Sequence, residues 1–260
     1  MYRIFFRLYL LLILINSVYA QNYVYNGVQF YNETKEYFKA PINWQAKDFI
    51  ILSSVAASTY LLMQTDENLN NYVVKSGNEN KTIIYETARV FGEPYFSPII
   101  GTILLINGSV TDNNSNKRLG FEILQSIFYS GVTSGFVKIC FGRSRPYQSL
   151  GNSDFHPFSS FDDSKLSLPS GHTTLSFALF TTLSLNSKND VMKVIYFVPA
   201  LFTAASRVAQ NKHWLSDVFL GATIGYFTAR FVHSLHDFPQ LEQTAIPQQS
   251  DLISFSVPLF

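Results

Sequence analysis

The chain has 260 residues, which is enough for one domain of ordinary size with a substantial core. Its 19 lysines and arginines nearly balance 18 aspartates and glutamates, so no strong overall field would recruit nucleic acid, and we expect no nucleic-acid partner. The single cysteine, Cys140, cannot form an intrachain disulfide and therefore indicates no cellular compartment.

The first twenty residues predict an export signal. Arg3 and Arg7 supply the positive start, residues 8–15 the apolar core, and Val18-Tyr19-Ala20 a small-residue cleavage site before Gln21. An uncleaved membrane anchor is the alternative interpretation of the same stretch. Under either interpretation we expect an exported protein in a periplasmic or extracytoplasmic location, soluble or membrane-associated.

The next part of the chain predicts a polar arm followed by an apolar helix. Residues 21–47 are polar and aromatic, and we expect an irregular arm with helix near residues 33–38. Asp48 is a candidate N-cap for a first apolar helix over residues 49–63. The polar run Gln64-Thr65-Asp66-Glu67 predicts the end of that helix.

A polar connection then leads to the second apolar segment. Residues 64–94 carry few apolar runs, with one short predicted helix at about residues 82–90. The second apolar segment covers residues 98–106, and the Asn, Asp, Ser and Gly residues at 107–116 predict a loop.

The third predicted helix runs over about residues 119–143. Lys138 and Arg145 are seven residues apart and would share one helical face if the helix reached that far. Pro146 restricts the residues before it to extended geometry, so the helix should end there with both cations at its C-terminal end. Two pairs of glycines four residues apart predict close helix approach, namely Gly131 with Gly135 and Gly221 with Gly225.

The C-terminal half predicts a loop and three more helices. Residues 147–168 have no helical period and lead into the next helix, so we interpret them as a rim that shapes substrate access. Ser170 is a candidate N-cap, and Pro199 should kink the helix that contains it. The predicted helices cover residues 170–185, 191–206 and 213–235.

Three clusters of polar residues stand in this half of the chain. They are Lys138 with Arg145-Pro146, then Pro169-Ser170-Gly171-His172, then Ser206-Arg207 with His213 and Asp217. In this order and at these spacings they resemble the signature of the type 2 phosphatidic acid phosphatase (PAP2) and vanadium haloperoxidase superfamily, with no position missing. The resemblance covers roughly residues 119–235. It implies an all-α fold, a PAP2/haloperoxidase-like helical bundle of about six main helices.

The predicted organisation follows from these elements. We expect a signal peptide at 1–20, an N-terminal arm at 21–47, a PAP2-like phosphatase domain at 48–238 and a C-terminal tail at 239–260. The apolar runs of the third, fifth and sixth helices are shorter than the roughly 20 residues that span a bilayer. We therefore favour an exported helical domain, soluble or membrane-attached, over a protein with six membrane spans.

The residue types in the clusters suit phosphate chemistry. Lysine and arginine donate hydrogen bonds to phosphate oxygens, and a helix N-terminus offers unpaired N–H groups to an anion. The resemblance implies that phosphate is bound by Lys138, Arg145, Ser170, Gly171 and Arg207.

Two histidines and an aspartate are the predicted catalytic residues. His213 and Asp217 are four residues apart, so on one helical face the carboxylate could hold the ring in one tautomer. The resemblance implies that His213 attacks phosphorus to form a phosphohistidine. It also implies that His172 protonates the leaving oxygen and then activates water.

The leading hypothesis is a metal-independent phosphatase that needs no cofactor. It would hydrolyse phosphate monoesters or pyrophosphates on a small molecule or a lipid. The alternatives are a vanadate-dependent haloperoxidase and a non-catalytic polytopic membrane protein. A thiolate phosphatase is excluded, because the arginine that it requires six positions after its cysteine is replaced here by Pro146.

Overall fold

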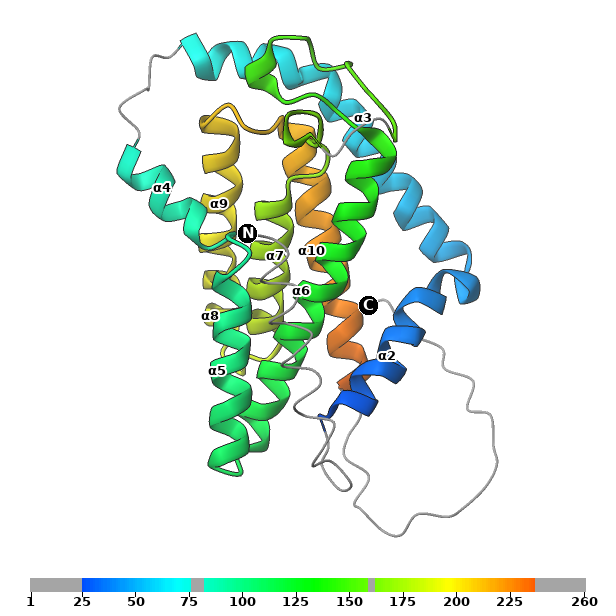
Figure 1. The fold of residues 1–260 in the computed structure, drawn as a ribbon, viewed down its shortest axis with the longest axis vertical. Helices are drawn as coiled ribbons and strands as arrows, with labels where there is room; N and C mark the ends of the chain where they lie inside the picture. The colour runs from blue at the N-terminus through cyan, green and yellow to red at the C-terminus, as the bar shows by residue number, and fades with distance from the viewer. Residues whose placement is uncertain (1–24, 76–81, 159–161, 237–260) are drawn as a thin grey trace.

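The computed structural model describes residues 25–75, 82–158 and 162–236, which form a helical bundle (Figure 1). This confirms the predicted all-α class. A long central helix, α6, packs against three neighbours that run along its length. These four helices are α6 (Asn114–Phe141), α5 (Phe96–Val110), α7 (Gly171–Leu185) and α10 (Leu215–His236).

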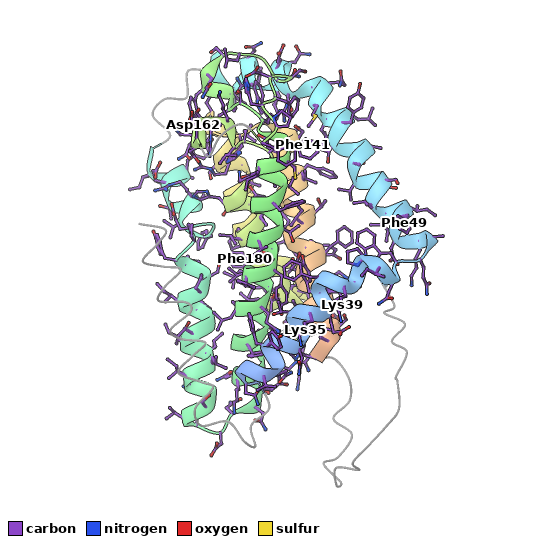
Figure 2. All side chains as sticks on the ribbon, turned by 45° about the vertical axis from the view of Figure 1, so that its right-hand side comes forward. Lys35, Lys39, Phe49, Phe141, Asp162 and Phe180 are labelled. Atoms are coloured by element: carbon purple, nitrogen blue, oxygen red, sulfur yellow. The ribbon has the colours of Figure 1, made fainter. Side chains whose placement is uncertain are left out.

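Further helices cover this centre. α9 (Phe197–Ala209) packs on α7, and the short α4 (Thr82–Val90), predicted at the same residues, packs on α9. α3 (Ala46–Lys75) contacts α10 and runs diagonally, so that its first turns near Phe49 stand apart from α6 (Figures 1 and 2). α8 (Asp190–Ile195) precedes α9.

The N-terminal elements are longer than predicted. α2 (Gly27–Lys39) occupies much of the arm that we expected to be irregular, and the Asn26 side chain caps it by accepting from Gln29 N. α3 does not end at the polar run 64–67 but continues through it to Lys75. The prediction failed there because the polar Asp66 side chain is buried against distant residues and is not in solvent.

Three helix ends also differ from the prediction. The expected loop at 107–116 shrinks, because α5 runs to Val110 and α6 starts at Asn114. α6 ends at Phe141, since Gly142 takes φ +58° and lies too close to the His156 carbonyl to carry a side chain. Arg145 therefore lies in extended chain beyond the helix. The expected kink is a break between α8 and α9 at Tyr196, just before Pro199.

Glycines make the closest contacts between helices. Of the two predicted glycine pairs, only Gly221 with Gly225 makes such a contact. A Cβ atom at Gly225 would lie 2.3 Å from the Thr174 carbonyl oxygen, so α10 and α7 touch backbone to backbone. Gly131 and Gly135 make no such approach, because a Cβ at Gly135 would meet nothing within 4 Å. The close contact of α6 is instead made by Gly120 against α5.

The bundle has a partly polar interior and an apolar exterior. A small apolar core is formed by Ile123, Ile127, Leu179, Phe180 and Ala200. Around it many serine and threonine side chains are buried and satisfied inside the bundle, such as Thr182 bonded to Ser126 at 3.1 Å. Large apolar side chains are exposed on α3, α5, α8 and α9 (Figure 2).

Two helices among the described residues are long and apolar enough to cross a membrane. They are Ala46–Val73, whose apolar stretch has few buried residues, and Asp190–Ala209, which includes the break at Tyr196. α5 is a shorter apolar helix of the same character. By length and composition alone this is weak support for membrane spans.

Candidate active site

The three sequence clusters meet at the end of the bundle where α6 stops and α7 and α10 begin. The Lys138 ammonium group donates to the Leu166 carbonyl, directly before the second cluster. Ser170 N donates to the Asp217 carbonyl at 2.9 Å, which joins the second cluster to the third. Arg145 Nη1 lies 3.2 Å from His213 Nε2 and joins the first to the third.

His213 lies just before α10 and not on it. Its Nδ1 is 2.9 Å from the Ser167 carbonyl oxygen, which can only accept a hydrogen bond. Nδ1 therefore carries the proton in the neutral ring, and the lone pair is on Nε2, where it accepts from Arg145 Nη1. Burial, followed by the charges of Arg145 and Lys138, holds the pKa of His213 well below its ordinary value. The ring is thus neutral at neutral pH.

Asp217 does not orient His213 directly, contrary to the prediction. Asp217 Oδ2 lies 3.6 Å from His213 Nδ1, too far for a hydrogen bond. It accepts instead from Trp214 N at 2.9 Å and from the Ser167 hydroxyl at 2.5 Å. Ser167 is therefore the link, because its carbonyl holds the imidazole while its hydroxyl holds the carboxylate.

An arginine and an aspartate that the sequence reasoning missed complete this part of the site. Arg143 is fully buried and donates to Asp217 Oδ1 at 2.7 Å and to Asp66 Oδ2 at 2.8 Å. Asp66, from α3, also accepts from Ser216 N at 3.0 Å. Arg143 could have been noticed in the sequence, because it stands two residues before Arg145, an arginine of the signature. Nothing local pointed to Asp66.

The helix start that carries the second cluster is open to an anion. Ser170 is the N-cap residue of α7, as predicted, but its side chain caps no backbone group and accepts from Thr173 Oγ1 at 2.9 Å. The N–H groups of Gly171 and His172 stand in the first turn, where helices have no internal acceptor. A Cβ atom on Gly171 would lie 3.7 Å from Lys138 Cε, so the ammonium stem borders this helix start.

Arg207 and His172 face each other across this end of the bundle. Arg207 is almost fully buried, and its Nε atom has no hydrogen-bond partner among the described residues. Burial and the charge of Arg207 lower the pKa of His172 to about 4. Burial and the charge of Arg145 lower the pKa of Lys138 to about 7. Several cationic side chains are thus largely buried at this end of the bundle, and one of them, Arg207, has an N–H group without an acceptor in the described part of the chain. A bound phosphate would supply acceptors for these donors.

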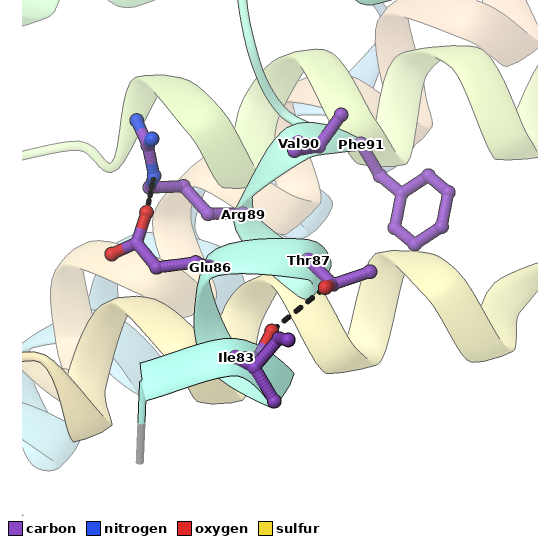
Figure 3. A pocket seen from close by; sticks show the side chains of 6 residues that line it. All are labelled: Ile83, Glu86, Thr87, Arg89, Val90 and Phe91. Atoms are coloured by element: carbon purple, nitrogen blue, oxygen red, sulfur yellow. Dashed lines mark hydrogen bonds and ion pairs between the residues drawn. The ribbon is translucent and has the colours of Figure 1, made fainter. Parts of the chain in front are cut away.

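An open groove of about 400 Å³ lies along α4 (Figure 3). It is lined by Ile83, Glu86, Thr87, Arg89, Val90 and Phe91. None of the predicted site residues lines it. The groove is connected to the site through Gln210, which bonds Glu86 at 2.7 Å and Arg207 at 2.7 Å.

No described group of three or more His, Cys, Asp or Glu side chains is arranged to hold a metal ion. The site residues that the sequence predicted, namely Lys138, Arg145, Ser170, Gly171, His172, Arg207, His213 and Asp217, all lie at this end of the bundle.

Known proteins resemble this chain in sequence. The family model of the PAP2 superfamily matches residues 119–240. The lipid A 1-phosphatase of Rhizobium etli is 26% identical over 201 residues, covering 71% of this chain and 82% of the relative. The lipid A 1-phosphatase of Porphyromonas gingivalis is 33% identical over 127 residues, covering 47% of this chain but 25% of the relative. The probable lipid phosphate phosphatase 4 of Arabidopsis thaliana is 34% identical over 149 residues, covering 46% and 47%. The chain thus spans less than half of the length of two of these three relatives.

The fold is also shared with a solved structure. The crystal structure of LpxE from Aquifex aeolicus matches with a TM-score of 0.50 and 24% identity, covering 65% of this chain and 94% of that one. All three clusters lie inside the matched residues 119–240. By its signature and its family match, the part of the chain from residue 119 to residue 240 belongs to the PAP2 superfamily.

Proposed function

We propose that the chain is a metal-independent phosphatase that hydrolyses a lipid-linked phosphate monoester or pyrophosphate through a phosphohistidine at His213. The observation that carries the proposal is the state of His213. Its Nδ1 is held by the Ser167 carbonyl, while its Nε2 lies 3.2 Å from Arg145 Nη1. Attack on the phosphorus atom of a phosphate anion requires a nucleophile with a lone pair and a positive charge close by. The neutral ring nitrogen and the guanidinium group provide these.

In the first step, Nε2 of His213 attacks phosphorus, and the bond from phosphorus to the leaving oxygen breaks. The negative charge of a bound phosphate favours the imidazolium form of His172, which gives its proton to that oxygen, so an alcohol leaves instead of an alkoxide. Lys138, Arg145 and Arg207 balance the negative charge on the non-bridging oxygens. Asp217 holds the loop of His213 through Trp214 N and Ser167.

In the second step, water attacks the phosphorus of the phosphohistidine. Neutral His172 takes the proton of the water, and the bond from phosphorus to nitrogen breaks. Inorganic phosphate leaves, His213 is neutral again, and His172 has recovered the proton that it lost in the first step. Each residue thus returns to its starting state without a metal ion or a cofactor.

The lipid substrate is supported by the surface and by the relatives. The relatives are named for lipid A and lipid phosphates. Large exposed apolar side chains cover α3, α5 and α9, including Leu61, Ile103 and Phe202. Such a surface fits association with a membrane that presents the substrate. The predicted export signal accords with an exported, extracytoplasmic and membrane-associated enzyme.

The test is phosphate release by the purified chain. The substrates are lipid A, phosphatidic acid, an isoprenoid pyrophosphate and a soluble alkyl phosphate, each with and without EDTA. We expect release from at least one lipid, unchanged by EDTA and blocked by vanadate, and at least about a hundredfold loss of kcat in His213→Ala. Equal rates in wild type and His213→Ala, or metal-dependent turnover, would refute the proposal.

A further inference from the structure

The chain between α4 and α5 lies against His172, outside the three signature clusters. Glu93 Oε1 is 3.3 Å from His172 Nε2, an ion-pair distance, although no hydrogen bond of good geometry forms. A Cβ atom on Gly92 would lie 2.5 Å from the His172 carbonyl oxygen and 2.8 Å from its Cβ. The backbone at Gly92 is therefore in direct contact with His172, and this contact brings the neighbouring carboxylate to the imidazole.

Glu93 belongs to a series of hydrogen-bonded charged and polar side chains that begins on α4 and ends on α9. Arg89 Nη1 donates to Glu93 Oε1, and Arg89 Nε donates to Glu86 at 2.9 Å (Figure 3 shows Arg89 and Glu86). Glu86 in turn accepts from Gln210 Nε2 at 2.7 Å. Gln210 Oε1 accepts from Arg207 Nη1 at 2.7 Å. The series thus connects one side of the phosphate site to the other.

Positive charges face His172 from several elements. Arg207 acts on it from α9 and Arg89 from α4, while the neutral ring of His213 stands in the segment before α10. Among the described residues, Glu93 supplies the negative charge that acts on this imidazole. Burial and Arg207 favour the neutral ring, whereas Glu93 favours the imidazolium ring. The proton donor of the proposed mechanism therefore depends on this carboxylate.

We propose that Glu93 is a positioning residue that holds His172 and stabilises its imidazolium form for protonation of the leaving oxygen. The inference rests on the proposed function. It adds a carboxylate beside the acid histidine, on a segment that precedes the matched residues 119–240.

The leaving group distinguishes this role from a structural one. An alkyl phosphate leaves as a poor alkoxide and requires the proton, whereas 4-nitrophenyl phosphate has a good leaving group that does not. Losing the Glu93 charge should therefore slow hydrolysis of the alkyl substrate selectively. A change that only loosens the fold would slow both substrates alike.

The experiment compares wild type, Glu93→Gln, Glu93→Asp and Glu36→Gln with both substrates over a range of pH. Glu36→Gln is the matched control, because it removes an exposed carboxylate on α2. We expect Glu93→Gln to lower kcat for the alkyl phosphate at least about tenfold and for 4-nitrophenyl phosphate at most about threefold. The alkaline limb of kcat/KM should move to lower pH, since the imidazolium form is less stable without the carboxylate.

Glu93→Asp keeps the charge and should lie between wild type and Glu93→Gln for the alkyl substrate, which keeps the test informative if Glu93→Gln folds poorly. Equal losses for both substrates with an unmoved alkaline limb would overturn the role of Glu93 and leave the phosphatase intact. A wild-type chain that releases phosphate from neither these substrates nor the lipids would overturn the proposed function itself.

Discussion

At His213 the surroundings of the two ring nitrogens decide the chemistry. Nδ1 faces the Ser167 carbonyl and Nε2 faces Arg145, so the ring is held in one tautomer with its lone pair among cations. A carbonyl oxygen fixes the tautomer as well as a carboxylate does, because both accept a hydrogen bond from the Nδ1–H group. Asp217 is thereby available to accept from Arg143, Ser167 and Trp214.

The depressed pKa of His213 gives a prediction for stability against pH. Burial first and Arg145 second keep the folded ring neutral, while the unfolded ring binds a proton below its ordinary pKa. The unfolded state therefore takes up more protons as the pH falls, and acidification costs stability. We expect the thermal midpoint of His213→Gln to fall less than that of wild type between pH 7.5 and 5. Parallel falls in the two proteins would contradict this reasoning.

At the scale of elements, α3 reaches the site through one buried ion network. Arg143 is held between Asp66 on α3 and Asp217 on α10, and all three side chains are withdrawn from water. Removing one partner from such a buried network leaves an uncompensated charge, which costs far more than the loss of an exposed pair. The network therefore fixes α3 to the loop that follows α6.

Asp66→Ala should lower the free energy of unfolding by about 3 kcal/mol, because Arg143 keeps a buried charge with one partner fewer. Asp66→Asn should cost less, since the amide can still accept from Ser216 N. Asn68→Ala, at an exposed position on the same helix, is the control and should change the unfolding free energy by less than about 0.5 kcal/mol. Denaturant titration measures all three, and an Asp66→Ala curve that overlays the Asn68→Ala curve would disprove the role of the network.

The differences between predicted and observed elements have a common physical cause. The bounds of α4 could be predicted because they depend on neighbours within one or two turns, whereas the signature residues were recognised by their order and spacing along the chain. The end of α3 could not, since Asp66 is polar and its buried partner Arg143 lies 77 residues away. The role of Ser167 was also hidden, because it acts through a backbone carbonyl that every residue possesses.

At the scale of the whole molecule, many serine and threonine side chains are buried and many large apolar side chains are exposed. Ser126, Thr181 and Thr182 are fully buried, while Ile103, Leu201 and Phe202 are more than half exposed. These exposed apolar side chains accord with the proposed membrane association.

We expect the wild-type chain to float with phospholipid vesicles in a density gradient. Leu201→Glu with Phe202→Glu should lower the floating fraction at least about threefold, because both side chains are exposed on α9 and would place charges in the lipid. Lys188→Glu, at an exposed polar turn, is the control and should float like wild type. A double variant that floats as well as the control would argue against lipid contact at α9.

The backbone contact between α10 and α7 has a consequence for the catalytic pair. A Cβ atom on Gly221 would lie 2.6 Å from the Ser170 carbonyl oxygen, one residue before the α7 turn that carries His172. His213 enters from the start of the same α10 helix. The relative position of the segments that carry His172 and His213, the proposed proton donor and nucleophile, is therefore set by two polypeptide backbones in contact, with no side chain between them. A larger residue at position 221 would force α10 away from Ser170 and so displace the start of α7 from α10.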